Sequence, residues 1–293
     1  MSLLSDTAHT PERIFGLLKL LDALGGEAPR DVVQSIMTSR AEEQIAFTQT
    51  VGAATSLNLV GTDRTTLRMQ VAPTPATHAE FSDLCYDRIL ATNDGGRGDA
   101  EEDDDNALLL TAYAVVALKC DQLRSLSWFC DHLDVSSFAD EVRVAAATAN
   151  PGGALFNATK KAPWQRWMVN LGLIEDIGQG AFIPDVTRRL RSEIARAGPQ
   201  FAVTQTATQF ARWARTRLPF LPGGHLFASV TGQAPRPGEC GVLLSAALRN
   251  LRDEGVIRLT TVGDAAGQVA LTPDDADPTR SFSEVSIVGR SPA

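Results

Sequence analysis

Basic side chains concentrate in one stretch of this chain, residues 160–217. The stretch holds ten lysines and arginines against four acids, a net charge of +6, whereas the whole chain carries −8. The remainder must therefore carry −14. Lysine and arginine bind phosphate groups by neutralising their charge and releasing counterions. So strong a division of charge predicts one basic face on an acidic body, a pattern typical of nucleic-acid binding. From this stretch the predicted contacts are Lys160, Lys161, Arg166, Arg188, Arg189, Arg191, Arg212 and Arg215.

A later helix adds two further candidate contacts, Arg249 and Asn250. Both are expected on the face opposite a leucine stripe, together with Asp253. Arginine and asparagine are the usual readers of guanine and adenine in the major groove. Arg249 and Asp253 also lie four residues apart, a spacing that favours an ion pair on a helix surface. DNA contact and an ordinary solvated face both remain open for this helix.

Motifs that carry enzymatic chemistry are missing. The chain has neither the G-x-x-x-x-G-K-[ST] loop of nucleotide hydrolases nor a G-x-S-x-G nucleophile elbow. Pro184-Asp185 resembles the opening of a nuclease motif, but no lysine stands in the E-x-K arrangement that would complete it. We predict a protein that is not an enzyme, with no catalytic residues, no metal and no cofactor. The four histidines show no metal-ligand pairing; they are His9, His78, His132 and His225.

Two segments invite a metal hypothesis. The loop 93–106 contains six carboxylates within residues 99–105, but it lacks the alternating ligands and central glycine of a calcium loop. We interpret it as a solvated acidic loop. Cys130 and His132 could supply half of a site, although a buried thiol beside a surface histidine is the favoured interpretation. The four cysteines form no C-x-x-C pair, which fits a reducing compartment.

The elements that must position these side chains are clearest near the C-terminus. Leu244, Leu248 and Leu251 recur at helical spacing and predict a buried stripe. Gly255 is expected to end that helix, because glycine takes the left-handed conformation without steric cost. Residues 256–261 and 268–271 then predict two strands of a hairpin around a glycine-containing loop. A helix followed by such a hairpin is the second half of a winged helix-turn-helix.

The same arrangement occurs twice more, which indicates an internal repeat. Near the N-terminus a helix at 47–57 precedes a turn at 61–64 and a strand at 65–71. In the middle a helix at 164–171 precedes a turn at 178–180 and a short apolar segment. Thr10 and Pro11 are typical of a helix start, and two further helices lead to the first hairpin. Residues 10–72 thus predict a complete winged helix.

Proline- and glycine-rich segments at 73–75 and 150–153 predict domain boundaries. We expect a mainly α protein with small β-hairpins, in which tandem winged helix-turn-helix modules surround a helical middle region. The expected domains are an N-terminal winged helix at 1–72, a helical region with the acidic loop at 73–150, a second winged-helix-like module with a basic helix at 151–200, and a helix plus a C-terminal winged helix at 201–293.

Composition agrees with a soluble globular protein. At 293 residues the chain exceeds one typical domain, and its 44% hydrophobic and 21% charged content is ordinary. The longest apolar stretch, 107–118, is too short to span a bilayer. The first residues contain no basic region before an apolar run, so no secretory signal is expected. We predict a cytoplasmic protein with no membrane partner.

Several short phrases, in order along most of the chain, resemble the DpdG-type proteins of bacterial 7-deazaguanine DNA modification and restriction clusters. They are residues 11–15, 167–173, 183–187, 244–248 and 282–285. None of these phrases is catalytic. The resemblance implies a non-enzymatic component of an anti-phage or DNA-restriction assembly that works beside separate helicase or nuclease subunits. It carries over no active-site residues.

Together these observations predict a non-catalytic accessory subunit of a defence or restriction system that binds double-stranded DNA, with or without modified bases. Two alternatives stay open: a protein-interaction scaffold whose winged helices bind partner subunits, and a winged-helix transcriptional regulator. Strong salt dependence of DNA binding favours either DNA hypothesis over the scaffold. Preference for a defined operator separates the regulator from the accessory subunit.

Overall fold

The structure is a computed structural model of the chain. It describes residues 3–4, 10–38, 43–94, 106–127, 135–149, 156–198, 204–234, 236, 238–263 and 267–288. The chain is mostly helical with small antiparallel sheets, which confirms the predicted fold class at that level. It divides into two compact units: Met1–Leu110 with Gly152–Leu171, and Thr111–Pro151 with Gly172–Ala293. The four domain boundaries proposed above remain predictions.

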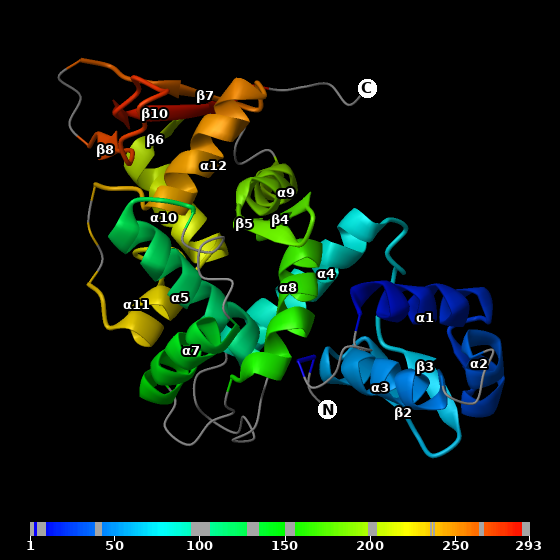
Figure 1. Cartoon of the computed structure of the whole chain (residues 1–293). Helices are drawn as coiled ribbons and strands as arrows, with labels where there is room; N and C mark the ends of the chain where they lie inside the picture. Colours follow the sequence, from blue (N-terminus) through cyan, green and yellow to red (C-terminus); the bar gives the residue numbers. More distant parts are fainter. Residues whose placement is uncertain are drawn as a thin grey trace. The chain divides into compact units, whose positions relative to one another are not determined.

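The first unit begins with three helices around a small sheet (Figure 1). Thr10 caps the first helix, because its hydroxyl accepts a hydrogen bond from the Arg13 N–H at 3.4 Å. Ile14, Leu17 and Leu21 of this helix are fully buried, as the spacing predicts. The helices are α1 (Pro11–Ala23), α2 (Arg30–Met37) and α3 (Glu43–Ser56).

Three short antiparallel strands complete this module. They are β1 (Glu27–Pro29), β2 (Val60–Thr62) and β3 (Thr66–Met69), in the sheet order β1-β3-β2. The hairpin of β2 and β3 confirms the predicted one. Asp63 fixes its turn, since one carboxylate oxygen accepts the N–H groups of Thr65 and Thr66 at 2.9 and 2.7 Å. The strand β1 was not expected, because three residues ending in proline give no periodic signal.

The rest of the first unit is helical and closes over a buried aromatic core. Phe15 of α1 contacts Phe81, with ring centroids 5.2 Å apart. The Trp164 indole donates a hydrogen bond to the Leu109 carbonyl at 2.9 Å, and the Ser82 hydroxyl donates to the Asn170 carbonyl at 2.6 Å. These elements are α4 (His78–Asp94), the start of α5 (Ala107–Leu123), the 3₁₀ turn η1 (Ala158–Lys160) and α8 (Lys161–Leu171).

The second unit takes up α5 from Thr111 onward and adds a helical layer and a hairpin. Helix α7 (Val135–Ala149) packs on α11 (His225–Thr231). The strands β4 (Ile174–Gly178) and β5 (Ala181–Pro184) form a two-stranded hairpin. Tyr113 links this hairpin to α5, because its hydroxyl donates a hydrogen bond to the Leu173 carbonyl at 2.6 Å.

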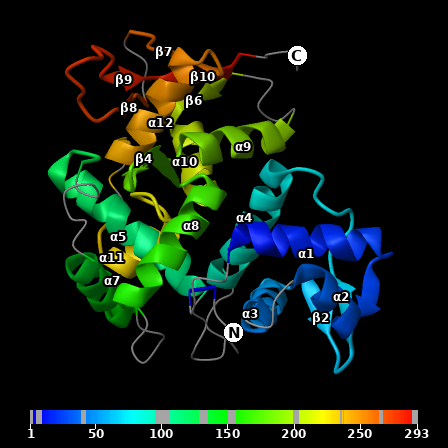
Figure 2. The same cartoon turned by 45° about the vertical axis from the view of Figure 1, so that its right-hand side comes forward.

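The C-terminal part of this unit surrounds the leucine-rich helix α12, in both views of the chain (Figure 2). Gly255 has a φ of +71° and follows the end of α12, as predicted. The helices are α9 (Thr187–Ala197), α10 (Ala207–Arg217) and α12 (Val242–Asp253). The strands are β6 (Gln205–Thr206), β7 (Ile257–Thr260), β8 (Val269–Ala270), β9 (Ser281–Phe282) and β10 (Glu284–Ile287).

The predicted pairing within this part was wrong. The segment 268–271 was expected to pair with 256–261, but β7 pairs with β10 and the later strand β8 pairs with β9. The helix expected at the start of the domain 201–293 begins at Ala207, directly after β6. The three-stranded sheet has the order β6-β10-β7.

The two ends of the chain share one order of elements. The N-terminal module runs α1-β1-α2-α3-β2-β3. The C-terminal part runs α9-β6-α10-α12-β7-β10, with α11 inserted after α10 and the β8-β9 pair inserted after β7. The third strand lies in the centre of both sheets, and the first helix packs on the third in both. The first helix of the C-terminal set is therefore the arginine-rich α9.

Within the parts of the chain that the structure describes, no helix is both long and apolar enough to cross a bilayer.

Candidate nucleic-acid interface

Three of the predicted contacts, Lys160, Lys161 and Arg166, belong to the first unit. Lys160 ends η1 and is half-buried. Lys161 is only 6% exposed, so it cannot present its charge to a nucleic acid. Arg166 is exposed on α8. The predicted basic stretch 160–217 is thus shared between two units.

Helix α9 carries the next three candidates, and two of them are used inside the protein. Arg189 is 2% exposed and pairs with Glu193 at 3.3 Å. Arg191 forms an ion pair with Glu254 at the end of α12. Arg188 is exposed. Desolvation lowers the pKa of Arg188, and the neighbouring Arg189 charge lowers it further, against the attraction of Glu175 and Asp185.

On helix α10, Arg212 is exposed to solvent, whereas Arg215 is bonded to the segment that follows the helix. The Arg215 guanidinium donates hydrogen bonds to the carbonyls of Pro222 at 3.2 Å and Glu239 at 2.5 Å. Gly223 lies directly under this guanidinium, and a Cβ there would come within 2.8 Å of it. Arg215 thus fixes the segment after α10, and Arg212 is the candidate on this helix that faces outward.

The prediction that Arg249 lies on an exposed face of α12 was wrong. Its side chain is 8% exposed and donates to an Asp277 carboxylate oxygen at 2.7 Å and to the Thr272 carbonyl at 2.8 Å. Asp253, the suggested partner of Arg249, pairs instead with Arg252. Asn250 is exposed, but its amide donates to the Thr187 hydroxyl at 3.0 Å.

The rest of α12 is also buried by other segments of the protein. Eight of its residues are buried, from Val242 at the start to Leu251 near the end. At its N-terminus the Val242 N–H donates to the Asp121 carboxylate at 3.3 Å, and a Cβ at Gly241 would meet Pro222 at 2.7 Å. The loop after β8 covers Arg249. This helix therefore cannot enter a major groove in the conformation described.

A cluster that the sequence did not reveal lies between α9 and α10. The carboxylate of Glu193, 1% exposed, accepts from Arg196 at 3.0 Å and from Arg217 at 2.6 Å, besides Arg189. Arg196 and Arg217 are one-third exposed. They line a pocket of about 200 Å³ whose other walls are Glu193, Ala197 and Trp213. The sequence shows the i,i+4 spacing of Arg189 and Glu193 and the i,i+3 spacing of Glu193 and Arg196, but not Arg217, which approaches from another helix.

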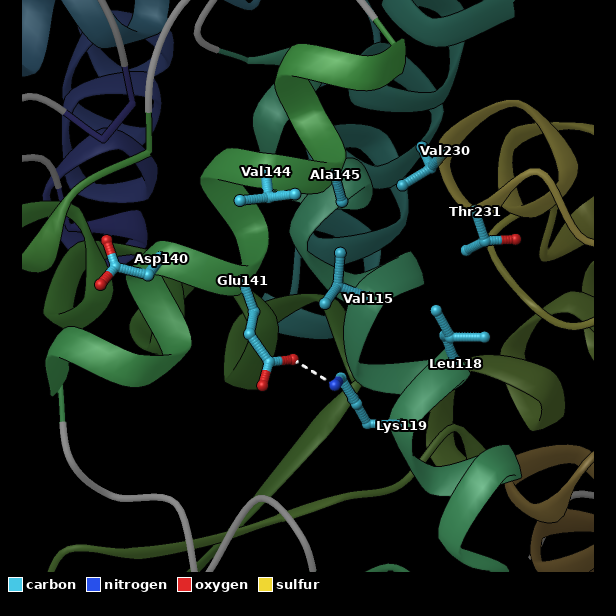
Figure 3. A pocket seen from close by; sticks show the side chains of 9 residues that line it. All are labelled: Val115, Leu118, Lys119, Asp140, Glu141, Val144, Ala145, Val230 and Thr231. Atoms are coloured by element: carbon cyan, nitrogen blue, oxygen red, sulfur yellow. Dashed lines mark ion pairs between the residues drawn. The ribbon is translucent and has the colours of Figure 1, made fainter.

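A second cavity in the same unit has a different character. It measures about 440 Å³, which is in the range of small-molecule sites. Aliphatic side chains from α5, α7 and α11 line it, among them Val115, Val144 and Val230 (Figure 3). Lys119 and Glu141 turn toward each other at one end and form an ion pair of 2.7 Å. This cavity suits an aliphatic group and not a phosphate.

Few other side chains among the described residues are candidates for metal binding or thiol chemistry. Among the described residues no group of three or more histidine, cysteine or acidic side chains is placed to hold a metal ion. Cys85, Cys120 and Cys240 are buried, and burial raises the pKa of the Cys240 thiol to about 12. The acidic residues 99–105 and the pair Cys130 and His132 lie outside the described residues.

The comparison with protein families decides the affiliation. A family model described as DpdG-like matches residues 1–265. The chain belongs to the DpdG-like family. No curated protein and no solved structure matches the chain. Membership in this family suggests a component of a Dpd system, and the resemblance of the short sequence phrases is confirmed.

Proposed function

We propose that the protein is a non-catalytic accessory subunit of a bacterial Dpd modification and restriction system, and that its second unit contacts DNA. The observation that carries this proposal is the charge of α9 and α10. The segment 187–217 holds seven arginines and one acid, a net charge of +6 in a chain whose net charge is −8. Such a concentration attracts the phosphate backbone irrespective of base sequence. Family membership supports the assignment to a DNA-modification system.

The order of elements supports two winged helices in this proposal. A strand that follows the first helix and pairs with the last strand, with a hairpin after the third helix, is the arrangement of a winged helix-turn-helix. The N-terminal module has this order of elements, and the C-terminal part has it with α11 inserted after α10 and the β8-β9 pair inserted between β7 and β10. In that fold the third helix reads bases and the hairpin approaches the backbone. The third helices are α3 and α12.

The burial of α12 favours contact with the DNA backbone over recognition of the base sequence. A transcriptional regulator needs an accessible recognition helix, whereas α12 is buried on most of its surface and Arg249 is held by Asp277. In the second unit, Arg188 and Arg212 are exposed and can contact phosphates. The burial of α12 therefore favours the accessory-subunit hypothesis over the regulator hypothesis.

A specific observation also supports the scaffold as a second function, in the first unit. Val32 and Ile36, four residues apart on α2, are 41% and 57% exposed, and Ile45 at the start of α3 is 69% exposed. Helix α3 contains no lysine or arginine. A third helix without basic residues, beside exposed aliphatic side chains, suits a protein partner better than a duplex. The partner that we propose for this face is another subunit of the same system.

The DNA proposal is tested by fluorescence anisotropy of labelled duplex at increasing salt. We expect Arg188→Ala combined with Arg212→Ala to weaken binding about tenfold or more and to reduce the salt slope by about one unit per lost phosphate contact. Arg143→Ala is the control, because Arg143 is exposed on α7, outside the arginine-rich helices. Equal affinities for the double variant and the control, or no binding at low salt, would contradict DNA contact.

A further inference from the structure

We propose that the pocket between α9 and α10 is a phosphate-binding site, and that the phosphate is a phosphodiester of single-stranded nucleic acid. Its assignment to nucleic acid rests on the proposed function, whereas the anion site rests on the pocket itself. None of Arg196, Arg217 and Trp213 belongs to the contact set that the sequence predicts. The proposal therefore adds a further group of side chains to the nucleic-acid contact.

The first support is the charge around the pocket. Three guanidinium groups, from Arg189, Arg196 and Arg217, converge on the carboxylate of Glu193. The four side chains together carry a formal charge of +2. Glu193 is 1% exposed and lies beneath the arginines, while Arg196 and Arg217 are 32% and 34% exposed. Two guanidinium groups, those of Arg196 and Arg217, and one carboxylate, that of Glu193, therefore line the pocket, and the two guanidinium groups are its exposed charges.

The second support is the rigidity of the arginines. A long side chain that is free in solution loses rotamer freedom when it binds an anion. Here Glu193 already holds Arg217 at 2.6 Å and Arg196 at 3.0 Å, so much of that cost is met in the folded protein. A planar guanidinium also matches two phosphate oxygens at once. Glu193 acts as a positioning residue in this arrangement.

The third support is the size of the pocket and its aromatic wall. Its volume of about 200 Å³ is several times the roughly 30 Å³ share of one water molecule in the liquid. It is smaller than a typical small-molecule site, so it suits a phosphate group better than a large cofactor. Trp213 forms one wall, and an indole is a platform on which a nucleobase stacks. A phosphate with an adjacent unstacked base therefore fits these residues best.

Single strands fit this site better than duplexes. In a duplex the bases are stacked in the interior, and only the backbone can approach a pocket of this kind. In a single strand the base next to the bound phosphate is free to reach Trp213.

Trp213 supplies the readout for the test. We would titrate the full-length protein with oligothymidylate and, separately, with inorganic phosphate, and follow tryptophan fluorescence. Oligothymidylate should quench the signal and bind at least tenfold more tightly than inorganic phosphate. Arg196→Gln should weaken both ligands, oligothymidylate about tenfold, with a salt slope shallower by about 0.7. Trp213→Phe should abolish the quench and assigns it to that residue.

Arg212→Ala separates this proposal from the proposed function. Arg212 is exposed on α10 but does not line the pocket. Its loss should weaken duplex and oligonucleotide binding and leave the response to inorganic phosphate unchanged. If Arg196→Gln, shown to be folded by circular dichroism, binds both ligands like the wild type, the pocket is not a phosphate site. Quenching by a phosphoserine peptide but not by oligothymidylate would overturn the assignment to nucleic acid.

Discussion

Two buried acids, Glu193 and Asp277, determine which of several arginines are bonded within the protein. Asp277 accepts hydrogen bonds from Arg249 at 2.7 Å and Arg252 at 2.9 Å, and it fixes the loop after β8 against α12. A sequence shows the positive charge of each arginine but not the acid that approaches it from a distant segment. Arg249 and Asp277 are separated by 28 residues. For that reason the exposed or buried state of individual arginines could not be predicted.

The environment of Asp277 predicts a pH dependence of stability. Burial raises the pKa of this carboxyl, but hydrogen bonds from Thr279, Arg249 and Arg252 outweigh burial and hold the pKa below its ordinary value. A carboxyl whose pKa is lower in the folded than in the unfolded chain adds stability above its unfolded value, about 3.9. That contribution is lost as the pH falls from there toward the folded pKa.

We therefore expect Asp277→Asn to lower the urea midpoint at pH 7, and the gap to the wild type to shrink below about pH 4. Unfolding curves at several pH values measure both effects. Asp275→Asn is the matched control, because Asp275 is an exposed acid of the same loop. A gap that stays constant down to pH 2.5 would show that the charge of Asp277 does not stabilise the fold.

At the scale of elements, local patterns predicted helices well and strand partners poorly. The helices α1 and α12 lie within a few residues of their predicted positions, because each combines a capping signal or a glycine stop with an apolar stripe. The partner of β7 was missed because residues 261–283, including the β8-β9 pair, separate it from β10. Nothing local marks a strand that pairs across such an insertion.

Helix α2 gives a prediction at this scale. Ile36→Lys should leave the melting temperature nearly unchanged, because Ile36 is 57% exposed, and should abolish co-purification with co-expressed subunits of the same Dpd system. Leu123→Lys is the control, since Leu123 is 56% exposed on α5 in the other unit. Subunits that co-purify equally with the wild type and with both variants would remove the support for the scaffold function.

At the scale of the whole molecule, the net charge of the chain and the charge of its arginine-rich helices have opposite signs. The chain carries −8 overall, which repels nucleic acid at long range, while α9 and α10 carry +6. The sequence predicted this concentration of arginines, but not which of them are buried or bonded within the protein. Of its ten predicted contacts, Lys161, Arg189 and Arg249 are buried, and Arg191 and Arg215 form bonds within the protein. The number of phosphates that the protein can neutralise is accordingly smaller than the sequence suggests.

The salt dependence of binding measures that number. Eight phosphates neutralised by the lysines and arginines predicted within residues 160–217 would give, on a duplex, a slope of log affinity against log salt of about −7, whereas three contacts on a single strand give about −2. Arg196 and Arg217 in the pocket and the exposed Arg212 of α10 make three. We expect the smaller value, measured by anisotropy of labelled oligothymidylate between about 50 and 200 mM salt, over which affinity should fall about twentyfold. A slope steeper than about −5 would mean that the internally bonded arginines are released when DNA binds, and the arrangement around Glu193 would then describe only the free protein.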